Sequence, residues 1–422
     1  MHRRQCHAEG ELRSTGMLWR MSFPLPIRFA ALTVSVALPA ALASGCSVAP
    51  QTQSGALTST SAAPTVEASQ PAKDQDGPKE TPMDRPEELS LMVTGDVLLH
   101  PQLLDEAETA AGKSDGNGKE FDFEPLLAGL KPYVQDADVA LCNLETPIGT
   151  PPYSGYPLFT VPSQIVSDLA AIGYDGCTTA TNHTVDAGTK GVIRTLDTLA
   201  KNEMFSTGSY KSKKDSEQPP IMDINDVKLG VVATTYSLNG MRADSDWRVD
   251  TGVNSSKLID RAKSARKAGA DIVVAAVHDG AEYTSAPTES QRKLGRALAG
   301  SGEFDFVYMH HTHSVLPIEK YKGTWIVYGL GNSVAKHATA TILNREGISV
   351  KATFARDGEN WDVSKLQWVP HQLSKAPVAW CQVATTETCV SDADAKASLQ
   401  RTLKTVDAYG AVDDGLEEWT LP

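Results

Sequence analysis

From about Leu89 onward, short apolar runs alternate with stretches of helical periodicity. Each run has the length and composition of a buried strand and ends in polar residues. The runs are 89–95, 138–143, 174–180, 228–236, 271–277, 304–309 and 325–330, and helices are expected at 162–172, 188–201, 255–268 and 288–300. This alternation predicts an α/β fold with largely parallel strands. Two more strands are expected within 347–369, and 371–422 is expected to be a looser, helical C-terminal extension.

Composition narrows the class of protein. The 422 residues suit one large domain or two ordinary ones. The chain has 39 basic and 52 acidic residues, a formal charge of −13, which argues against a nucleic-acid partner because such proteins present a basic face. Six cysteines are too few for a disulfide framework, and no Cys-x-x-Cys pair indicates a structural zinc site.

Residues 1–45 have the features of an export signal. A basic start leads into an apolar run from Phe29 to Ala43, which is about 15 residues long and too short to span a bilayer comfortably. The run ends in Ala-Ser-Gly before Cys46, which resembles a bacterial lipobox with alanine where leucine is usual. We expect Cys46 to be lipidated; a plain secretory signal and a retained membrane helix are the alternatives. Met1, Met17 and Met21 each remain candidate start codons.

The segment 46–88 is rich in Ser, Thr, Ala, Gln and Pro and has no apolar periodicity, so it is expected to be a disordered tether. Loss of 1–45 leaves 34 basic and 50 acidic residues, a balance of −16. The sequence therefore predicts an extracytoplasmic protein, anchored by lipid to the outer face of the bacterial cytoplasmic membrane.

Ligand-type side chains follow five of the expected strands. They are Asp96, then Asn143 and Glu145, then Asn182 and His183, then His278, and finally His310, His311 and His313. The carboxyl ends of strands in α/β sheets leave a crevice where ligands bind. Mixed carboxylate, amide and imidazole donors suit divalent Mn, Fe or Zn. Taken alone, Asp96 could cap a helix and any single histidine could be structural.

Five motifs together resemble the CapA family of poly-gamma-glutamate capsule-biosynthesis proteins, which is itself similar to calcineurin-like metallophosphoesterases. They are GDVLLH (95–100), NLETPIG (143–149), TNHTVDAG (181–188), HDGAEY with a later Pro and Gln (278–291), and HHTHSVLPIEKYKGTWIVYGLGN (310–332). The resemblance covers about 89–335 in the family's motif order. It implies that residues 89–370 form a metallophosphoesterase-like, four-layer αββα sandwich with the site at the strand ends.

The resemblance also implies two divalent metal ions (Mn, Fe or Zn). Asp96 and His313 would bind the first, Glu145 would bridge, and the remaining ligands of the second would be Asn182, His278 and His311. His183 would act as an acid beside the leaving group. The groups expected to support the ligands are Asn143, Glu282, Tyr283 and Asn332, with Glu282 and Tyr283 orienting His278. Asp186 and Gly188 are interpreted as caps of the following helix.

One departure from the metallophosphoesterase pattern bears on the metals. Leu98 stands where those enzymes have a histidine two residues after the first aspartate, so the first metal position is expected to be the weaker one. His100 either compensates for this loss or is an ordinary loop histidine. Asp279 stands where an aromatic residue is common in the family, and this departure is expected to affect substrate specificity.

Three functions fit these features. The first is a metal-dependent hydrolase of a small phosphoester or related bond in capsule or envelope polymer metabolism. The second is a non-catalytic factor that anchors or exports an anionic polymer such as poly-gamma-glutamate, together with other capsule-synthesis proteins. The third is a gamma-glutamyl amide hydrolase. The absence of a P-loop motif argues against ATP-dependent ligation by this chain.

Two cysteine pairs carry separate expectations. Cys381 and Cys389 are expected to form a disulfide, because they lie close together in a polar stretch of an exported protein. Cys142 and Cys177 fall inside expected strands and are interpreted as small apolar core residues.

Overall fold

The computed structural model describes residues 86–113, 119–385 and 388–421. The expected signal peptide, Cys46 and nearly all of the expected tether lie outside these residues. Within the described residues, no helix is both long and apolar enough to cross a membrane. The first strand of the described residues, β1, begins at Glu88, close to the expected start at Leu89.

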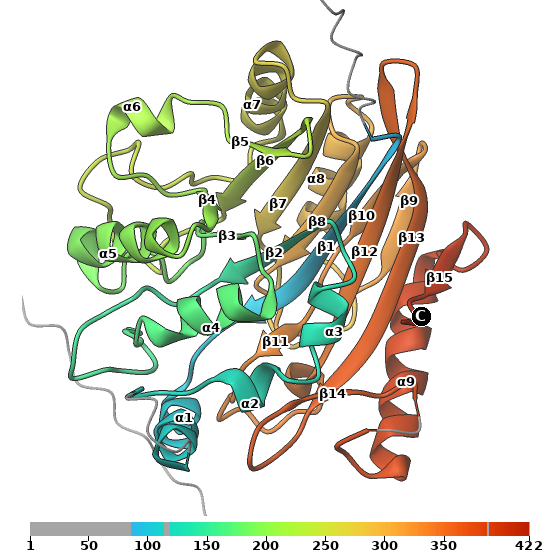
Figure 1. Ribbon diagram of the computed structural model, residues 1–422. Helices are drawn as coiled ribbons and strands as arrows, with labels where there is room; N and C mark the ends of the chain where they lie inside the picture. The colour runs from blue at the N-terminus through green and yellow to red at the C-terminus, as the bar shows by residue number, and fades with distance from the viewer. Residues whose placement is uncertain (1–85, 114–118, 386–387, 422) are drawn as a thin grey trace, which may run out of the picture. The chain divides into compact units, whose positions relative to one another are not determined.

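The first sheet has the strand order β14-β13-β12-β1-β2-β3-β4, with β11 paired to β1 and β15 paired to β13 (Figure 1). Strands β1 to β4 run parallel, whereas the pairs β1–β12, β12–β13 and β13–β14 are antiparallel and β13–β15 is parallel. The strands are β1 Glu88–Val97, β2 Val139–Leu144, β3 Gly176–Thr178, β4 Phe205–Thr207, β11 Asn332–Val334, β12 Glu346–Asp357, β13 Asn360–Leu373, β14 Trp380–Gln382 and β15 Leu416–Glu418.

The second sheet has the order β5-β6-β7-β8-β10-β9, in which β6, β7, β8 and β10 run parallel and the two edge strands are antiparallel. Its strands are β5 Ile221–Ile224, β6 Val227–Thr235, β7 Ile272–His278, β8 Phe306–His310, β9 Ile318–Tyr321 and β10 Thr324–Val327. Every strand expected from the sequence is present in one of the two sheets. The expected parallel pairing holds for β1 to β4 of the first sheet and for β6, β7, β8 and β10 of the second, whereas β12, β13 and β14 pair antiparallel.

The longer helices coincide with the expected ones. They are α4 Gln164–Ile172, α5 Gly188–Lys201, α7 Ser255–Lys267 and α8 Glu289–Ala299, with α1 Pro101–Lys113 and α9 Asp392–Val406 in addition. Short helical elements are α2 Glu124–Leu127, α3 Lys131–Val134, α6 Lys213–Ser216, η1 Leu343–Arg345 and η2 Asp407–Tyr409. The start of α8 carries a capping box between Thr288 and Gln291, which satisfies two backbone donors of the first turn.

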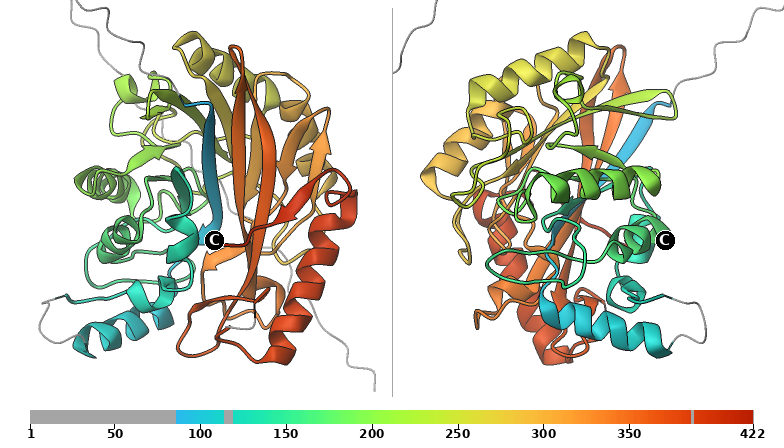
Figure 2. Two further views of the ribbon diagram at one scale, coloured as in Figure 1. Left: turned by 45° about the vertical axis from the view of Figure 1, so that its right-hand side comes forward. Right: turned by 90° about the vertical axis from the view of Figure 1, so that its left-hand side faces the viewer.

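Three buried apolar clusters define the layers. The first lies between the sheets and joins Leu91 and Val93 of β1 to Val231 of β6 and Val274 of β7. A second joins the other face of the first sheet to α1 and α4, and a third joins the other face of the second sheet to α7 and α8. The predicted four-layer αββα sandwich is therefore confirmed. In Figure 2, left view, α1, α4 and α5 gather on one side and α9 lies on the other.

The C-terminal stretch differs from the expected helical extension. It supplies α9, but it also supplies β14 and β15, which pair with β13 of the first sheet. Val406 of α9 belongs to the apolar cluster between the sheets. Residues after 370 are thus part of the sandwich, because their apolar side chains complete its core.

The structure contains the expected disulfide between Cys381 and Cys389, whose Cα atoms are 5.2 Å apart. It also joins Cys142 to Cys177, whose Cα atoms are 4.4 Å apart. The interpretation of this second pair as core residues without a bond was wrong. The physical reason is the register of β2 and β3, which places the two cysteines directly opposite each other.

Candidate metal centre

Strand register brings the sequence motifs together. At the carboxyl end of β1, Asp96 lies opposite Asn143 of β2 on one side and Asn332 of β11 on the other. In the second sheet, the end of β7 places His278 opposite His310 of β8. The polar residues that close these strands therefore meet at one place, as expected for parallel strands that end together.

Glu145, just past β2, is fully buried and neither of its carboxylate oxygens has a hydrogen-bond partner within the described part of the chain. Its Oε1 lies 3.7 Å from Nε2 of His278 and 3.7 Å from Nε2 of His313. Ligand atoms of Glu145, His311 and His313 all lie within 4.8 Å of one another. Burial raises the pKa of Glu145 well above its usual value, and His313 only partly offsets this.

The imidazole of His278 is held by two asparagines. Its Nε2 lies 2.8 Å from Oδ1 of Asn182, and its Nδ1 lies 3.4 Å from Nδ2 of Asn143. Burial and the neighbouring His311 lower the pKa of His278 well below its usual value, so the ring stays neutral and its Nε2–H donates to Oδ1 of Asn182. Asn143 in turn accepts a hydrogen bond from Thr178 at 2.9 Å, which fixes the orientation of its amide.

Asp96 contacts His313 on the side of the ring that faces away from Glu145. Its Oδ2 is 3.1 Å from Nδ1 of His313, and its Oδ1 is 3.1 Å from Nδ1 of His310 and accepts a hydrogen bond from Asn143 at 2.9 Å. Nδ1 of His313 also lies 3.0 Å from Oδ1 of Asn332. Burial alone would raise the pKa of Asp96, but His310 and His313 lower it well below its usual value. In this arrangement Asp96 positions His313, whose Nε2 faces Glu145.

This donor set fits divalent metal ions. Buried polar atoms normally have partners, yet Glu145 offers two free oxygens and Nδ1 of His311 is also unpartnered within the described residues. Burial, together with His313, lowers the pKa of His311 to about 3, so its nitrogens are available as neutral donors. Carboxylate oxygen and imidazole nitrogen in a closed cluster are ligands for Zn, Mn or Fe. Of the residues that the resemblance implies as ligands, Glu145, Asn182, His278, His311 and His313 would hold metal, whereas Asp96 contacts His310 and His313.

Three residues of the site have left-handed backbone conformations. His311 and His313 have φ values of +85° and +50°, and Tyr283 has +57°, a region that residues with a Cβ atom rarely occupy. Gly95 precedes Asp96 where a Cβ atom would lie 2.3 Å from the carbonyl oxygen of Gly331, so only glycine fits there. Such strain clusters at functional sites, where the surrounding structure imposes it.

His183 lies at the rim of the cluster, with Nδ1 2.7 Å from Oδ2 of Asp186. The same carboxylate oxygen accepts the backbone N–H of Phe159 at 2.8 Å, and the Phe159 ring packs edge-on against His183 at 4.8 Å. The interpretation of Asp186 as a helix cap was wrong: α5 has no side-chain cap, and this carboxylate orients His183 instead. The spacing of three residues in the turn NHTVD was the signal that could have shown it.

The groups expected to orient His278 lie elsewhere. The hydroxyl of Tyr283 is 3.2 Å from Nδ1 of His337, and Glu282 is an exposed residue on the same loop. His337, which sequence reasoning missed, follows β11 and packs its ring 4.6 Å from that of His313 and 4.5 Å from that of His100. No motif marks His337, because only the β1–β11 pairing brings its loop to the site.

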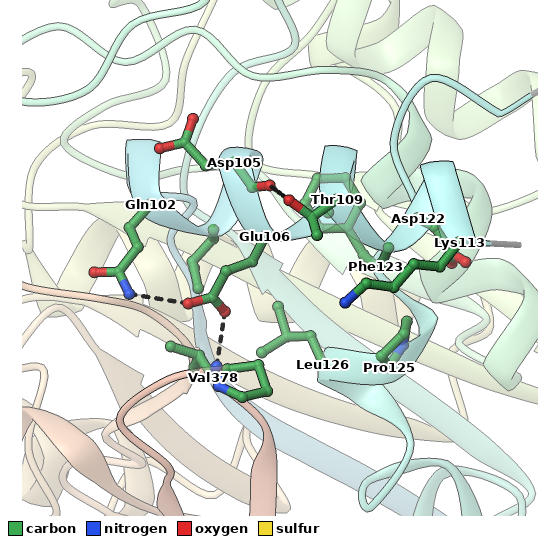
Figure 3. Close-up of a pocket in the computed structure, with 14 residues that line it drawn as sticks. Gln102, Asp105, Glu106, Thr109, Lys113, Asp122, Phe123, Pro125, Leu126 and Val378 are labelled. Atoms are coloured by element: carbon green, nitrogen blue, oxygen red, sulfur yellow. Dashed lines mark hydrogen bonds between the residues drawn. The ribbon is translucent and has the colours of Figure 1, made fainter.

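A largely apolar groove lies away from the candidate ligands. It has a volume of about 590 Å³ and is lined by α1, α2 and the Pro377–Val378 turn (Figure 3). The carboxylate of Glu106 points into it but is already bonded to Gln102 at 2.9 Å and to the backbone N–H of Val378 at 2.7 Å. None of the candidate ligands lines this groove.

Comparisons with known proteins match this picture. The chain is 26% identical over 215 residues to the "Capsule biosynthesis protein CapA" of Bacillus anthracis, covering 49% of this chain and 52% of that protein. It is 33% identical over 171 residues to the "PGA biosynthesis protein CapA" of Bacillus subtilis (strain 168), covering 40% of this chain and 44% of that protein. The chain thus spans about half the length of the curated relatives it matches.

Solved structures with a similar fold include a calcineurin-like phosphoesterase, YfkN, from Bacillus subtilis. It has a TM-score of 0.41 and 13% identity, covering 75% of this chain and 97% of that one. A 5'-nucleotidase precursor from Thermus thermophilus has a TM-score of 0.45 and 13% identity, covering 76% of this chain and 59% of that one. The family model "Bacterial capsule synthesis protein PGA_cap" matches residues 90–337, which hold the strand ends and all the candidate ligands. The chain belongs to this family.

Proposed function

We propose that this chain is a metal-dependent hydrolase of the phosphoesterase type, acting outside the cell in the metabolism of a capsule or envelope polymer. The observation that carries the proposal is the buried, unpartnered carboxylate of Glu145, which lies among the nitrogens of His278, His311 and His313. A bare carboxylate in that position is costly unless it binds a cation. A factor with a purely structural role has no need of such a group.

The proposed ligands are Glu145, Asn182, His278, His311 and His313, with Asp96 behind His313. Bound divalent cations would supply Lewis acidity and a nucleophile at neutral pH. The chain's own residues would then orient the ligand rings and transfer protons. Asn143 and Asn182 fix the ring of His278, while Asp96 and Asn332 fix that of His313. Fixed rings keep their lone pairs aimed at one point, which reduces the cost of reorganisation during a reaction.

His183 is the proposed acid. Because its Nδ1 is bonded to Asp186, its Nε2 is the nitrogen left to give a proton to a leaving oxygen. Only 8% of the His183 side chain is exposed, so that proton transfer takes place in a largely dry site. His183 lies near enough to His311 for its charge to contribute to the lowered pKa of that ring. The acid is therefore adjacent to the proposed ligands without being one of them.

The lipid anchor at Cys46 and the location at the outer face of the cytoplasmic membrane are part of the same proposal. They rest on the signal-like sequence before Cys46, outside the described residues. A polymer-binding factor without catalysis remains the second candidate, favoured by the printed names of the curated relatives. Poly-gamma-glutamate is the polymer to test first.

Purified protein, loaded with Mn²⁺, should hydrolyse aryl phosphate esters. His183→Ala should retain its metal by elemental analysis and lose hydrolysis. Gamma-glutamyl peptides, assayed in parallel, test the amide hydrolase alternative. Bound metal with no turnover of any phosphate ester would overturn the phosphoesterase proposal and favour the polymer-binding factor.

A further inference from the structure

His337 contacts the proposed metal ligand His313 in two ways. It is half-buried in the loop after β11, and the centre of its ring lies 4.6 Å from that of His313. Its Nε2 also lies 3.2 Å from Nδ2 of Asn332. Because Oδ1 of the same asparagine lies 3.0 Å from Nδ1 of His313, a single amide joins the two imidazoles.

The amide of Asn332 has one orientation that suits all of these neighbours. Its Nδ2 donates to the backbone carbonyl of Asn344 at 2.9 Å, so the amide nitrogen faces His337 and the amide oxygen faces His313. The backbone of Asn332 is held as well, since its carbonyl accepts a hydrogen bond from Nε2 of His371 at 2.8 Å. Turning the amide over would set its oxygen against the carbonyl of Asn344, where no hydrogen bond can form.

This orientation assigns a proton to each ring. Nδ2 of Asn332 donates to Nε2 of His337, so the proton of His337 is on Nδ1 and is donated to the hydroxyl oxygen of Tyr283 at 3.2 Å. On the other side, Oδ1 of Asn332 accepts the Nδ1–H of His313, whose lone pair is then on Nε2, 3.7 Å from Oε1 of Glu145. A histidine that binds metal through one nitrogen normally donates its other N–H in this way.

The far end of this chain of contacts belongs to the second sheet. Tyr283 is on the loop after β7, and its backbone N–H donates to the carbonyl of Thr312 at 2.9 Å. The hydroxyl of Ser314 donates to the carbonyl of Thr284 at 2.6 Å, which ties the same loop to the turn that carries His313. His337 therefore joins a loop of the second sheet to the first sheet at the site.

This inference rests on the proposed function, whose metal centre it extends: we propose that His337 is a positioning residue for His313 and so for the first metal position. It acts through Asn332 and through direct ring packing. It is not itself a ligand, because its Nε2 accepts from Asn332 and its Nδ1–H is given to Tyr283. Asp96 also contacts Nδ1 of His313, so loss of His337 should weaken the first position without abolishing it.

The second metal position should not depend on His337. Its proposed ligands besides the bridging Glu145 are Asn182, His278 and His311. Within the described part of the chain, the hydrogen bonds and ring contacts of His337 reach none of these three. A variant at His337 should therefore separate the two positions.

The test measures the affinities of the full chain for Mn²⁺ and Zn²⁺ by competition with a chelator. His337→Leu should weaken the more loosely bound ion about tenfold, the size expected when a partner of a ligand is lost, and leave the tighter ion unchanged. His337→Gln should restore most of that affinity, because its amide oxygen can accept the N–H of Asn332 in place of Nε2. Lys336→Met is the matched control on the same loop: its ammonium is bonded instead to the carbonyl of Lys375 at 2.8 Å.

A second measurement needs neither bound metal nor turnover. Nitrogen-15 spectra of the histidine rings in the metal-free chain should show His337 with its proton on Nδ1. Tyr283→Phe should shift that signal, and Lys336→Met should not. These spectra also decide the inference if His337→Leu does not fold.

The outcomes distinguish this inference from the proposed function. Two bound ions without hydrolysis of any ester would overturn the hydrolase function and leave the role of His337 standing. A wild type that never binds a second ion, unchanged affinities in His337→Leu, no recovery in His337→Gln, or a proton on Nε2 of His337 would each overturn the inference.

Discussion

Replacing Asp186 by Asn tests whether the His183–Asp186 pair works as a unit. Both the His183 ring and the backbone N–H of Phe159 bond to Oδ2 of this carboxylate, while its Oδ1 has no partner within the described residues. An asparagine can place its amide oxygen where Oδ2 lies and keep both contacts. The substitution therefore removes the charge and leaves the geometry in place.

The expected magnitudes follow from these two contacts. Hydrogen bonds to a charged group contribute about 1.5–3 kcal/mol and neutral ones about 0.5–1.5, so Asp186→Asn should lower the free energy of unfolding by about 1–3 kcal/mol. The effect on turnover should be much larger. A positioned general acid contributes about 10²–10⁴-fold to the rate, and His183 without its carboxylate should lose most of that in kcat. Metal content should not change, because His183 is not one of the proposed ligands.

The assay measures kcat on an aryl phosphate ester, metal content and thermal unfolding for each variant. Asp168→Asn is the matched control, since Asp168 is also buried and also accepts a backbone N–H, that of Phe123, at 2.8 Å. It should lose comparable stability and keep its kcat. Wild-type kcat in Asp186→Asn, or an equal loss of kcat in both variants, would show that the pair has no catalytic role.

Three further predictions concern metal, anchoring and pH. Dialysed protein should hold about one metal ion per chain and rise toward two with added Mn²⁺ or Zn²⁺, and His278→Ala should lose most of it by elemental analysis; full retention in that variant would exclude His278 as a ligand. Cys46→Ser should release the protein from the membrane fraction or leave an unprocessed precursor on immunoblots, and unchanged membrane association would refute lipidation. Burial lowers the pKa of His371 to about 4. The unfolded chain, whose histidines have a pKa near 6.5, then binds more protons, so His371 should cost about 3 kcal/mol of stability as the pH falls from 6.5 to 4. His371→Gln should flatten that part of the urea-unfolding profile, and an unchanged slope would contradict the assignment.

The local sequence predicted those elements in which apolar residues form a continuous run or recur at a regular spacing. The strands β1, β2, β6, β7 and β8 and the helix α5 follow from runs of buried residues or from a single apolar stripe, such as that of Val192, Leu196 and Leu199. Short elements were missed: β4 has three residues and β5 is an edge strand of four, too few to establish a period. Tertiary packing, not local sequence, selects them.

The site was predictable as a set of residue types and not as a set of contacts. Cys142 and Cys177 face each other because of the β2–β3 register, and His337 reaches His313 because β11 pairs with β1 far along the chain. Neither pairing leaves a trace in the local sequence. Asp186 had two physically reasonable partners, a helix terminus and an imidazole, and only the backbone path of the turn chose between them.

The buried environment of Leu98 explains why the two proposed metal positions should differ. Leu98 is 2% exposed and belongs to the apolar cluster beneath α1, so an imidazole at this position would lie in the core and not among the ligands. Nδ1 of His100 accepts the backbone N–H of Lys336 at 3.1 Å, which ties His100 to the loop after β11. Asp96 is then left with His313 and His310 as partners. Because an apolar side chain stands where the imidazole would be, fewer protein ligands face the first position, and it should load after the second.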